Sequence, residues 1–334
     1  MRRLRAGLIS FAHMHAYSYA RVLKELPNVE FVAIADDDKA RGEEACRRYG
    51  VKRFYEDFRE MFKREGLDFV VITSENAKHH DQAVEAAENG VHILCEKPIA
   101  TSLREADDMI SRARKAGVKF QTCFVMRYSD VVLRVKELLD SGELGRLMAI
   151  TATNHGKCPG GWFVDKKLAG GGTIMDHTVH VADLMRWFTG SEASKVYAEV
   201  GVNIRKQLKV EDNALIMLSF RNGVQASIDP SWSRPDSFPI WGDVYMELLG
   251  SDGRLMLDGF RQVVYSSNVK GEPTWVHHYW GCDVDYEMVN HFVKCITEDL
   301  EPRATGFDGR QALEIALAAY KSIEEGKPVE LPLL

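Results

Sequence analysis

The sequence lacks the features that several large classes of protein require. It has no run of about 18 apolar residues, so we expect no membrane span. Its formal net charge of -6 provides no basic excess, which argues against a nucleic-acid partner. Its six cysteines form no Cys-x-x-Cys pair, as is usual for free thiols in a reducing compartment, and we therefore expect a cytoplasmic protein.

The first residues, Met1 to Arg5, are basic, but we do not expect them to open a signal peptide. A signal peptide needs a longer apolar region and a small-residue cleavage site, whereas Ser10 and His13 interrupt the apolar stretch here. We expect a first β-strand instead.

The length of 334 residues favours two domains, because single hydrophobic cores stop growing near about 250–300 residues. The first 125 residues alternate short apolar strands with helices. This alternation is typical of βαβ units and predicts a parallel sheet covered on both faces. Strands are expected at 4–9, 31–35, 69–73, 91–95 and 118–125.

The second half changes character near residues 125–130. Strands follow one another with short turns, such as Asn222-Gly223, so this part predicts a largely antiparallel sheet. Strands are expected at 147–156, 195–204, 213–220, 224–232, 243–249 and 253–258, and helices at 171–189, 284–299 and 308–325.

Ligands of open parallel sheets bind at the carboxyl ends of the strands, and Asp36 closes the second strand. A carboxylate there can accept hydrogen bonds from the ribose hydroxyls of NAD and repel the 2′-phosphate of NADP. The alternative is a helix cap, although Asp37 or Asp38 could equally serve as that cap. Arg41 lies close enough in sequence to leave NADP possible.

The loop after the first strand departs from the Gly-x-Gly-x-x-Gly fingerprint of dinucleotide sites. Ser10, Ala12 and His15 stand at the three glycine positions, and Phe11 follows the first. The backbone of Ser10, Phe11 and Ala12 can still approach a pyrophosphate, but His15 is too large for the third position. We expect no metal, because His13 and His15 have no third ligand nearby in sequence.

Polar residues also follow the third and fourth strands. Ser74, Asn76 and His79 are expected to hold a nicotinamide ribose. A simple helix cap is the alternative, and the two roles are compatible. Glu96 and Lys97 follow the fourth strand, where Lys97 would point into the ligand crevice and Glu96 would pair with a cation or the cofactor ribose. An ordinary solvated loop is the alternative.

The run Gly170-Gly171-Gly172 precedes a predicted helix on which Asp176 and His180 share one face. Alcohol oxidation needs a base, and the imidazole of His180 suits that role, while Asp176 can orient the imidazole or bond another substrate hydroxyl. Lys97 can stabilise the alkoxide while a nicotinamide takes the hydride. A capped, partly buried histidine bonded to its own helix is equally compatible with the pattern.

Together, Asp36, Glu96-Lys97-Pro98 and the Gly-Gly-Gly-x-x-x-Asp-x-x-x-His run resemble the glucose–fructose oxidoreductase / inositol dehydrogenase (Gfo/Idh/MocA) family. Arg127-Tyr128 and Gly142-x-Leu144-Gly145 extend the resemblance over nearly the whole chain. It implies an α/β protein, with a Rossmann domain over 1–125 that binds NAD or NADP.

The resemblance also implies a C-terminal α/β domain over 126–334, with a large, mostly antiparallel open sheet for substrate binding and oligomerisation. Family members often pair through this sheet, so a homodimer or homotetramer is expected. Lys97, Asp176 and His180 are implied as the catalytic residues.

We expect the substrate to be a sugar, sugar derivative or cyclitol. Its candidate contacts are Arg127, His155, Trp162, Asp176 and His177. Trp162 could stack on a sugar ring or simply plug the space under its loop. Two other activities stay open: an enzyme that recycles a tightly bound NAD, for glycoside cleavage or sugar–sugar hydride transfer, and a non-catalytic, nucleotide-sensing binding protein.

Overall fold

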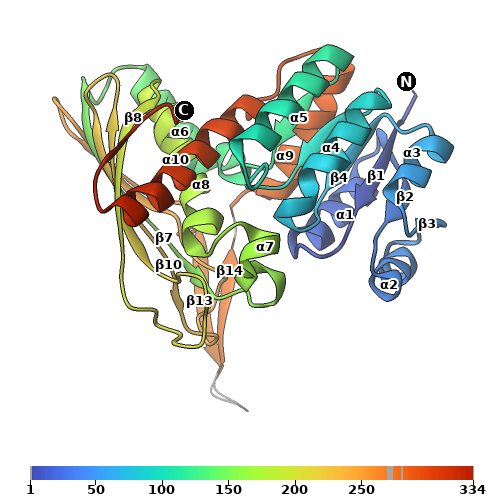
Figure 1. Cartoon of the computed structure of the whole chain (residues 1–334), viewed down its shortest axis with the longest axis horizontal. Coiled ribbons are helices and arrows are strands. Elements are labelled where there is room, and N and C mark those ends of the chain that lie inside the picture. Colours follow the sequence, from blue (N-terminus) through green and yellow to red (C-terminus); the bar gives the residue numbers. More distant parts are fainter. Residues whose placement is uncertain (1, 269–273, 280, 334) are drawn as a thin grey trace. The chain divides into compact units, whose positions relative to one another are not determined.

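The computed structural model describes residues 2–268, 274–279 and 281–333 (Figure 1). The chain forms two compact units. The first contains Met1–Val125 and Val284–Leu313, and the second contains Met126–Asp283 and Glu314–Leu334. The sequence analysis assigned all of 126–334 to the second domain, whereas 284–313 belongs to the first unit in the structure.

The first unit is built on a six-stranded parallel sheet in the order β3-β2-β1-β4-β5-β6. This is the strand order of a Rossmann fold, in which the direction of winding reverses between β1 and β4. The strands are β1 (Leu4–Ile9), β2 (Val29–Ala35), β3 (Arg53–Tyr55), β4 (Phe69–Ile72), β5 (His92–Cys95) and β6 (Phe120–Thr122). Strand β4 is buried throughout, as expected for a central parallel strand.

Helices of the first unit begin and end at local signals in the sequence. Asp38 caps its helix by accepting the Arg41 N–H at 3.0 Å, and Ser102 caps another in the same way. The helices are α1 (His15–Glu25), α2 (Lys39–Tyr49), α3 (Phe58–Glu65), α4 (His79–Glu88), α5 (Leu103–Ala116) and α9 (Val284–Thr297). The sequence analysis missed β3 and α3, which are short and lie between stronger signals.

The second unit carries a seven-stranded sheet in the order β12-β11-β7-β10-β9-β8-β15. Its pairings are antiparallel except for β7 with β10. These strands are β7 (Leu147–Lys157), β8 (Ala193–Val200), β9 (Ala214–Phe220), β10 (Gln225–Arg234), β11 (Tyr245–Gly250), β12 (Arg254–Asp258) and β15 (Val329–Glu330). A separate antiparallel pair joins β13 (Val263–Asn268) to β14 (Thr274–Tyr279). The predicted fold class is confirmed.

Helices cover one face of the seven-stranded sheet (Figure 1). They include α6 (Asp130–Asp140), α7 (Lys166–Ala169), α8 (Val179–Thr189) and α10 (Gly306–Glu325), whose last residues belong to this unit. Ser322 of α10, for example, accepts the backbone N–H of Ala198 in β8. Among the described residues, no helix combines the length and apolar character needed to cross a membrane.

Candidate active site

Asp36 lies at the carboxyl end of β2, where the sequence analysis expected a ribose-binding carboxylate. One of its oxygens, Oδ2, accepts the Phe11 N–H at 2.7 Å and the Arg41 Nε–H at 2.9 Å. The other, Oδ1, accepts the Asp38 N–H at 3.0 Å and Arg41 Nη2–H at 2.6 Å. The carboxylate therefore ties the β1 loop to the start of α2, and a ribose would share it with the Arg41 guanidinium.

The glycine-poor loop after β1 is held by specific contacts. Ser10 adopts a φ of 70°, the left-handed conformation that the first glycine of the fingerprint usually supplies. Its hydroxyl accepts the Ala12 N–H at 3.1 Å, and Phe11 packs edge-on against Tyr17 with ring centroids 5.2 Å apart. Ser10 and Ala12 thus form the tight turn without glycine.

A pocket of about 310 Å³ opens at this edge of the sheet. Three of the predicted cofactor residues, Ser10, Asp36 and Ser74, line it together. Ser74 also donates its hydroxyl to Gln82 at 2.7 Å, which fixes the loop after β4. The structure therefore brings part of the predicted cofactor set into one cavity.

His79 and Asn76 are buried under the same loop. The His79 ring contacts the carbonyl oxygen of Pro98 at 3.0 Å and that of Ser74 at 3.2 Å. Burial lowers the pKa of His79, although these hydrogen bonds oppose the shift. His79 therefore links the loops after β4 and β5, and its ring nitrogens are occupied by the backbone.

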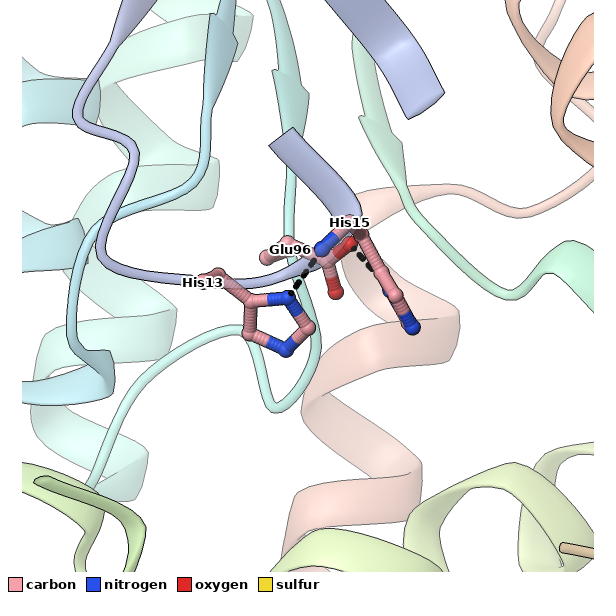
Figure 2. Close-up of side chains that lie close together, drawn as sticks. All are labelled: His13, His15 and Glu96. Atoms are coloured by element: carbon pink, nitrogen blue, oxygen red, sulfur yellow. Dashed lines mark hydrogen bonds and ion pairs between the residues drawn. The ribbon is translucent and has the colours of Figure 1, made fainter. Parts of the chain in front are cut away.

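Glu96 is the centre of a hydrogen-bond network at the end of β5. Its Oε1 lies 2.9 Å from His15 Nδ1 (Figure 2). The same oxygen accepts the Tyr19 hydroxyl at 2.6 Å, while Oε2 accepts the Lys97 backbone N–H at 3.0 Å. Burial raises the pKa of Glu96, but the charges of His13, His15 and Lys97 outweigh it and hold this pKa well below its usual range. Glu96 is thus an anion that fixes the backbone of Lys97.

His15 occupies the third glycine position without blocking the packing of α1. Its ring reaches Glu96, and its pKa is raised: burial lowers it, but the carboxylates of Glu96 and Asp285 prevail. Lys97 itself is buried and precedes a cis peptide bond to Pro98. The histidine that breaks the dinucleotide fingerprint therefore has a defined partner, which the sequence spacing did not reveal.

His13, His15 and Glu96 place one ligand atom each within 4.8 Å of one another (Figure 2). The expectation of no metal was based on the absence of a third ligand near the two histidines in sequence. No third ligand lies near them in sequence, but the sheet brings Glu96 to them in space from the end of β5.

Hydrogen bonds to Glu211 and Tyr320 hold the glycine-rich turn at Gly170–Gly172 in place. Glu211 Oε1 accepts the backbone N–H groups of Gly172 and Ile174, each at 3.0 Å, and the Tyr320 hydroxyl at 2.7 Å. A Cβ on Gly171 would lie 1.9 Å from the Tyr320 hydroxyl oxygen. The glycines are therefore required for this close approach.

The turn leads into a single π-helical turn, Ile174–Thr178, before α8 begins. The sequence predicts one regular helix over 171–189, with Asp176 and His180 on one face. The wider π geometry changes that register at Asp176, and such turns are frequent at functional sites. His180 lies in the first turn of α8 and is partly exposed.

The Asp176 carboxylate is oriented by two neighbouring rings. Its Oδ2 accepts the Trp232 indole N–H at 3.0 Å and lies 3.3 Å from His177 Nε2. The other nitrogen of His177 contacts the Asn154 carbonyl oxygen at 2.8 Å. Sequence reasoning missed Trp232, which is fully buried, and no local pattern marks it as a partner of Asp176.

Two predicted substrate residues are engaged elsewhere. Arg127 forms a buried bidentate pair with Asp183, both contacts being 2.7 Å, and such a pair is an ordinary structural element. His155 lies 3.0 Å from Asp229. Because Gly156 faces His177, strand alternation directs the His155 side chain to the opposite face of the sheet.

Trp162 stacks on its neighbour Phe163, with ring centroids 3.8 Å apart. Phe163 is buried and Trp162 is partly exposed, so one face of the loop is apolar and anchored. Of the five predicted substrate contacts, Asp176 and His177 lie together in the structure. A substrate role for any of the five stays a prediction.

The fold and these residues define a dinucleotide-binding oxidoreductase class, and comparison with known proteins agrees. Residues 4–124 match the model of the oxidoreductase family with an NAD-binding Rossmann fold. Residues 132–256 match the GFO/IDH/MocA C-terminal domain. The chain belongs to the Gfo/Idh/MocA family of oxidoreductases, as the resemblance predicted.

Curated relatives extend over almost the full length. The chain is 27% identical to myo-inositol 2-dehydrogenase of Thermotoga maritima, covering 98% of each protein. It is 25% identical to scyllo-inositol 2-dehydrogenase (NAD(+)) of Bacillus subtilis, covering 98% of this chain and 96% of the relative. Its fold matches that of scyllo-inositol dehydrogenase from Lactobacillus casei, solved with NAD(H) and scyllo-inositol, with a TM-score of 0.86 at 22% identity and coverage of 98% and 99%.

Proposed function

We propose that the protein is an NAD(P)-dependent dehydrogenase that oxidises a secondary hydroxyl of a sugar, sugar derivative or cyclitol. The observation that carries the proposal is the Asp176 carboxylate, which two ring nitrogens orient on the π-helical turn that leads into α8, the helix of His180. A fixed carboxylate and a partly exposed imidazole are suited to binding a hydroxyl and removing its proton. The full-length similarity to inositol dehydrogenases supports the same class of substrate.

The proposed roles follow from the chemistry of each side chain. His180 acts as the base for the substrate hydroxyl, and Asp176 accepts a hydrogen bond from the substrate or orients the imidazole. Lys97, whose backbone Glu96 holds at 3.0 Å, stabilises the developing alkoxide. The dinucleotide, when bound, accepts the hydride.

We propose that NAD is the preferred cofactor. Its ribose hydroxyls can share the acceptor atoms of Asp36, whereas the 2′-phosphate of NADP would meet that buried carboxylate. Arg41 is already paired with Asp36 and is therefore not free to neutralise a phosphate. Titrating Asp36→Ala with both nucleotides tests this: NADH affinity should fall, and the preference for NADH over NADPH should narrow or reverse.

The activity is tested by titrating the purified protein with NADH and NADPH, and then screening inositols and aldoses for nicotinamide reduction. Lys97→Ala and His180→Ala should each lower kcat by at least about 100-fold while the Kd for NADH changes little. His80→Ala, at a partly exposed histidine paired with Asp81 and Asp108, is the matched control and should retain activity. Failure of both nucleotides to bind would end the proposal.

We also propose that the protein is a cytoplasmic homo-oligomer that pairs through the uncovered face of the seven-stranded sheet. Leu215, Met217, Leu249 and Met256 are 63%, 62%, 51% and 56% exposed on its strands. Clustered exposed apolar side chains of this kind usually mark an interface. Met217→Lys should shift the mass in light scattering toward the monomer, whereas Val202→Lys, outside the strands, should not.

A further inference from the structure

Two histidines and a carboxylate come together at the carboxyl edge of the six-stranded sheet. His13 and His15 lie in the loop between β1 and α1, and Glu96 follows β5 (Figure 2). Their ligand atoms lie within 4.8 Å of one another. Glu96 is fully buried and His13 nearly so, while the His15 side chain is 32% exposed. The cluster is thus shielded but reachable from solvent through His15.

The spacing of His15 and Glu96 suits a shared cation. Two donors that each lie about 2.1 Å from a metal ion are about 3 Å apart when they meet it at a right angle and about 3.4 Å apart in a tetrahedral site. His15 Nδ1 and Glu96 Oε1 are 2.9 Å apart, so an ion can replace the proton that they share with little movement of either group.

His13 offers the third donor. One of its ring nitrogens lies within 4.8 Å of the ligand atoms of both His15 and Glu96. Its Nδ1 accepts the His15 backbone N–H at 3.1 Å, which holds the imidazole beside the other two ligands. The Tyr19 hydroxyl, 2.6 Å from Glu96 Oε1, would orient the carboxylate from behind.

The charges around the cluster tolerate a divalent ion. The positive charge of the Lys97 ammonium, which is felt at both His15 and Glu96, disfavours a cation at the cluster. Glu96 and Asp285, which accepts the Ser18 hydroxyl at 2.5 Å, supply two carboxylates against that one ammonium. Two imidazoles and a carboxylate form a donor set typical of zinc and other first-row transition metals.

We propose that His13, His15 and Glu96 form a binding site for a divalent first-row transition metal. The proposal is independent of the dehydrogenase activity. The proposal has one consequence for the dehydrogenase. Because the metal takes Glu96 and two residues of the β1 loop, metal and dinucleotide compete.

Cobalt(II) alone is the probe, added to the purified full-length protein without nucleotide or substrate. We expect one equivalent to bind per chain, with the visible spectrum of nitrogen and oxygen ligation. Thiolate ligands would instead add an intense sulfur-to-metal band, which separates this site from binding at Cys46 or Cys158. X-ray absorption of the same wild-type complex should show two imidazoles in the first shell, so this measurement requires no variant.

His13→Gln, His15→Gln and Glu96→Gln should each raise the Kd for cobalt(II) by more than about 100-fold. His80→Gln is the control and should leave it unchanged. Saturating NADH should raise the apparent Kd in the wild type. Sulfur ligation, no stoichiometric binding, or affinity that survives His15→Gln would overturn the proposal. These measurements use no nucleotide, so they do not bear on nucleotide binding or turnover, which test the dehydrogenase separately. Once NADH binding has been measured directly, cobalt(II) affinity that survives saturating NADH would also overturn the proposal.

Discussion

Tyr320→Phe is the sharpest test of how the glycine-rich turn presents Asp176. The change deletes one oxygen atom, which donates to Glu211 Oε1 at 2.7 Å and accepts the Gly172 N–H at 3.1 Å. Gly172 keeps its second acceptor, because its N–H also reaches Glu211 Oε1 at 3.0 Å. The variant therefore loses, in net terms, one buried hydrogen bond to a carboxylate.

A hydrogen bond to a charged group contributes about 1.5–3 kcal/mol, so we expect the free energy of unfolding to fall by about 2 kcal/mol. For a chain of this size the Tm should decrease by about 3 °C. Since the turn begins the π-helical segment that carries Asp176, kcat should also fall about tenfold while the Kd for NADH stays unchanged. Differential scanning calorimetry and steady-state kinetics measure the two effects.

Tyr197→Phe is the matched control in the same unit. Its hydroxyl also bonds to a carboxylate, that of Glu199, but this pair is exposed and its loss should leave the Tm unchanged. Glu211→Gln is a second variant to compare with Tyr320→Phe. All three hydrogen bonds to Glu211 end on Oε1, and the amide oxygen of glutamine can accept all three. An equal Tm for Tyr320→Phe and Tyr197→Phe would refute the idea that Tyr320 locks the turn.

Three further predictions follow from single contacts. Gly172→Ala places a Cβ 2.1 Å from a backbone carbonyl oxygen and should destabilise the protein by at least about 3 kcal/mol, whereas Gly223→Ala, which meets no atom within 4 Å, should cost about 1 kcal/mol in thermal melts. Trp232→Phe removes the indole donor to Asp176 and should lower kcat about tenfold; an unchanged kcat would contradict the orienting role. Burial, and to a smaller extent the charges of two nearby cations, lowers the pKa of His291 from 6.5 to about 4. Between these values only the unfolded chain binds the proton, so stability is lost as pH falls, and His291→Gln should lose less of its Tm on acidification.

Local signals in the sequence predicted most strands and helices of the first unit. The apolar strands and their helix caps, such as Asp38, act over a few residues, so they can be recognised without knowing the fold. The carboxyl ends of parallel strands meet at one edge, which is why Asp36 and Lys97 could be picked out as candidates. The short elements β3 and α3 escaped because three to eight residues carry little periodic signal.

The partners of the candidate residues were decided only by the tertiary structure. His15 and Glu96 are 81 residues apart, Trp232 and Asp176 are 56 apart, and Tyr320 and Glu211 are 109 apart. These contacts depend on sheet order and on packing between distant segments, which leave no periodic pattern along the chain. The sequence by itself determined the fold class, the family and the candidate residues, whereas the folded chain determined what holds each one, since hydrogen-bond partners are set by proximity in space.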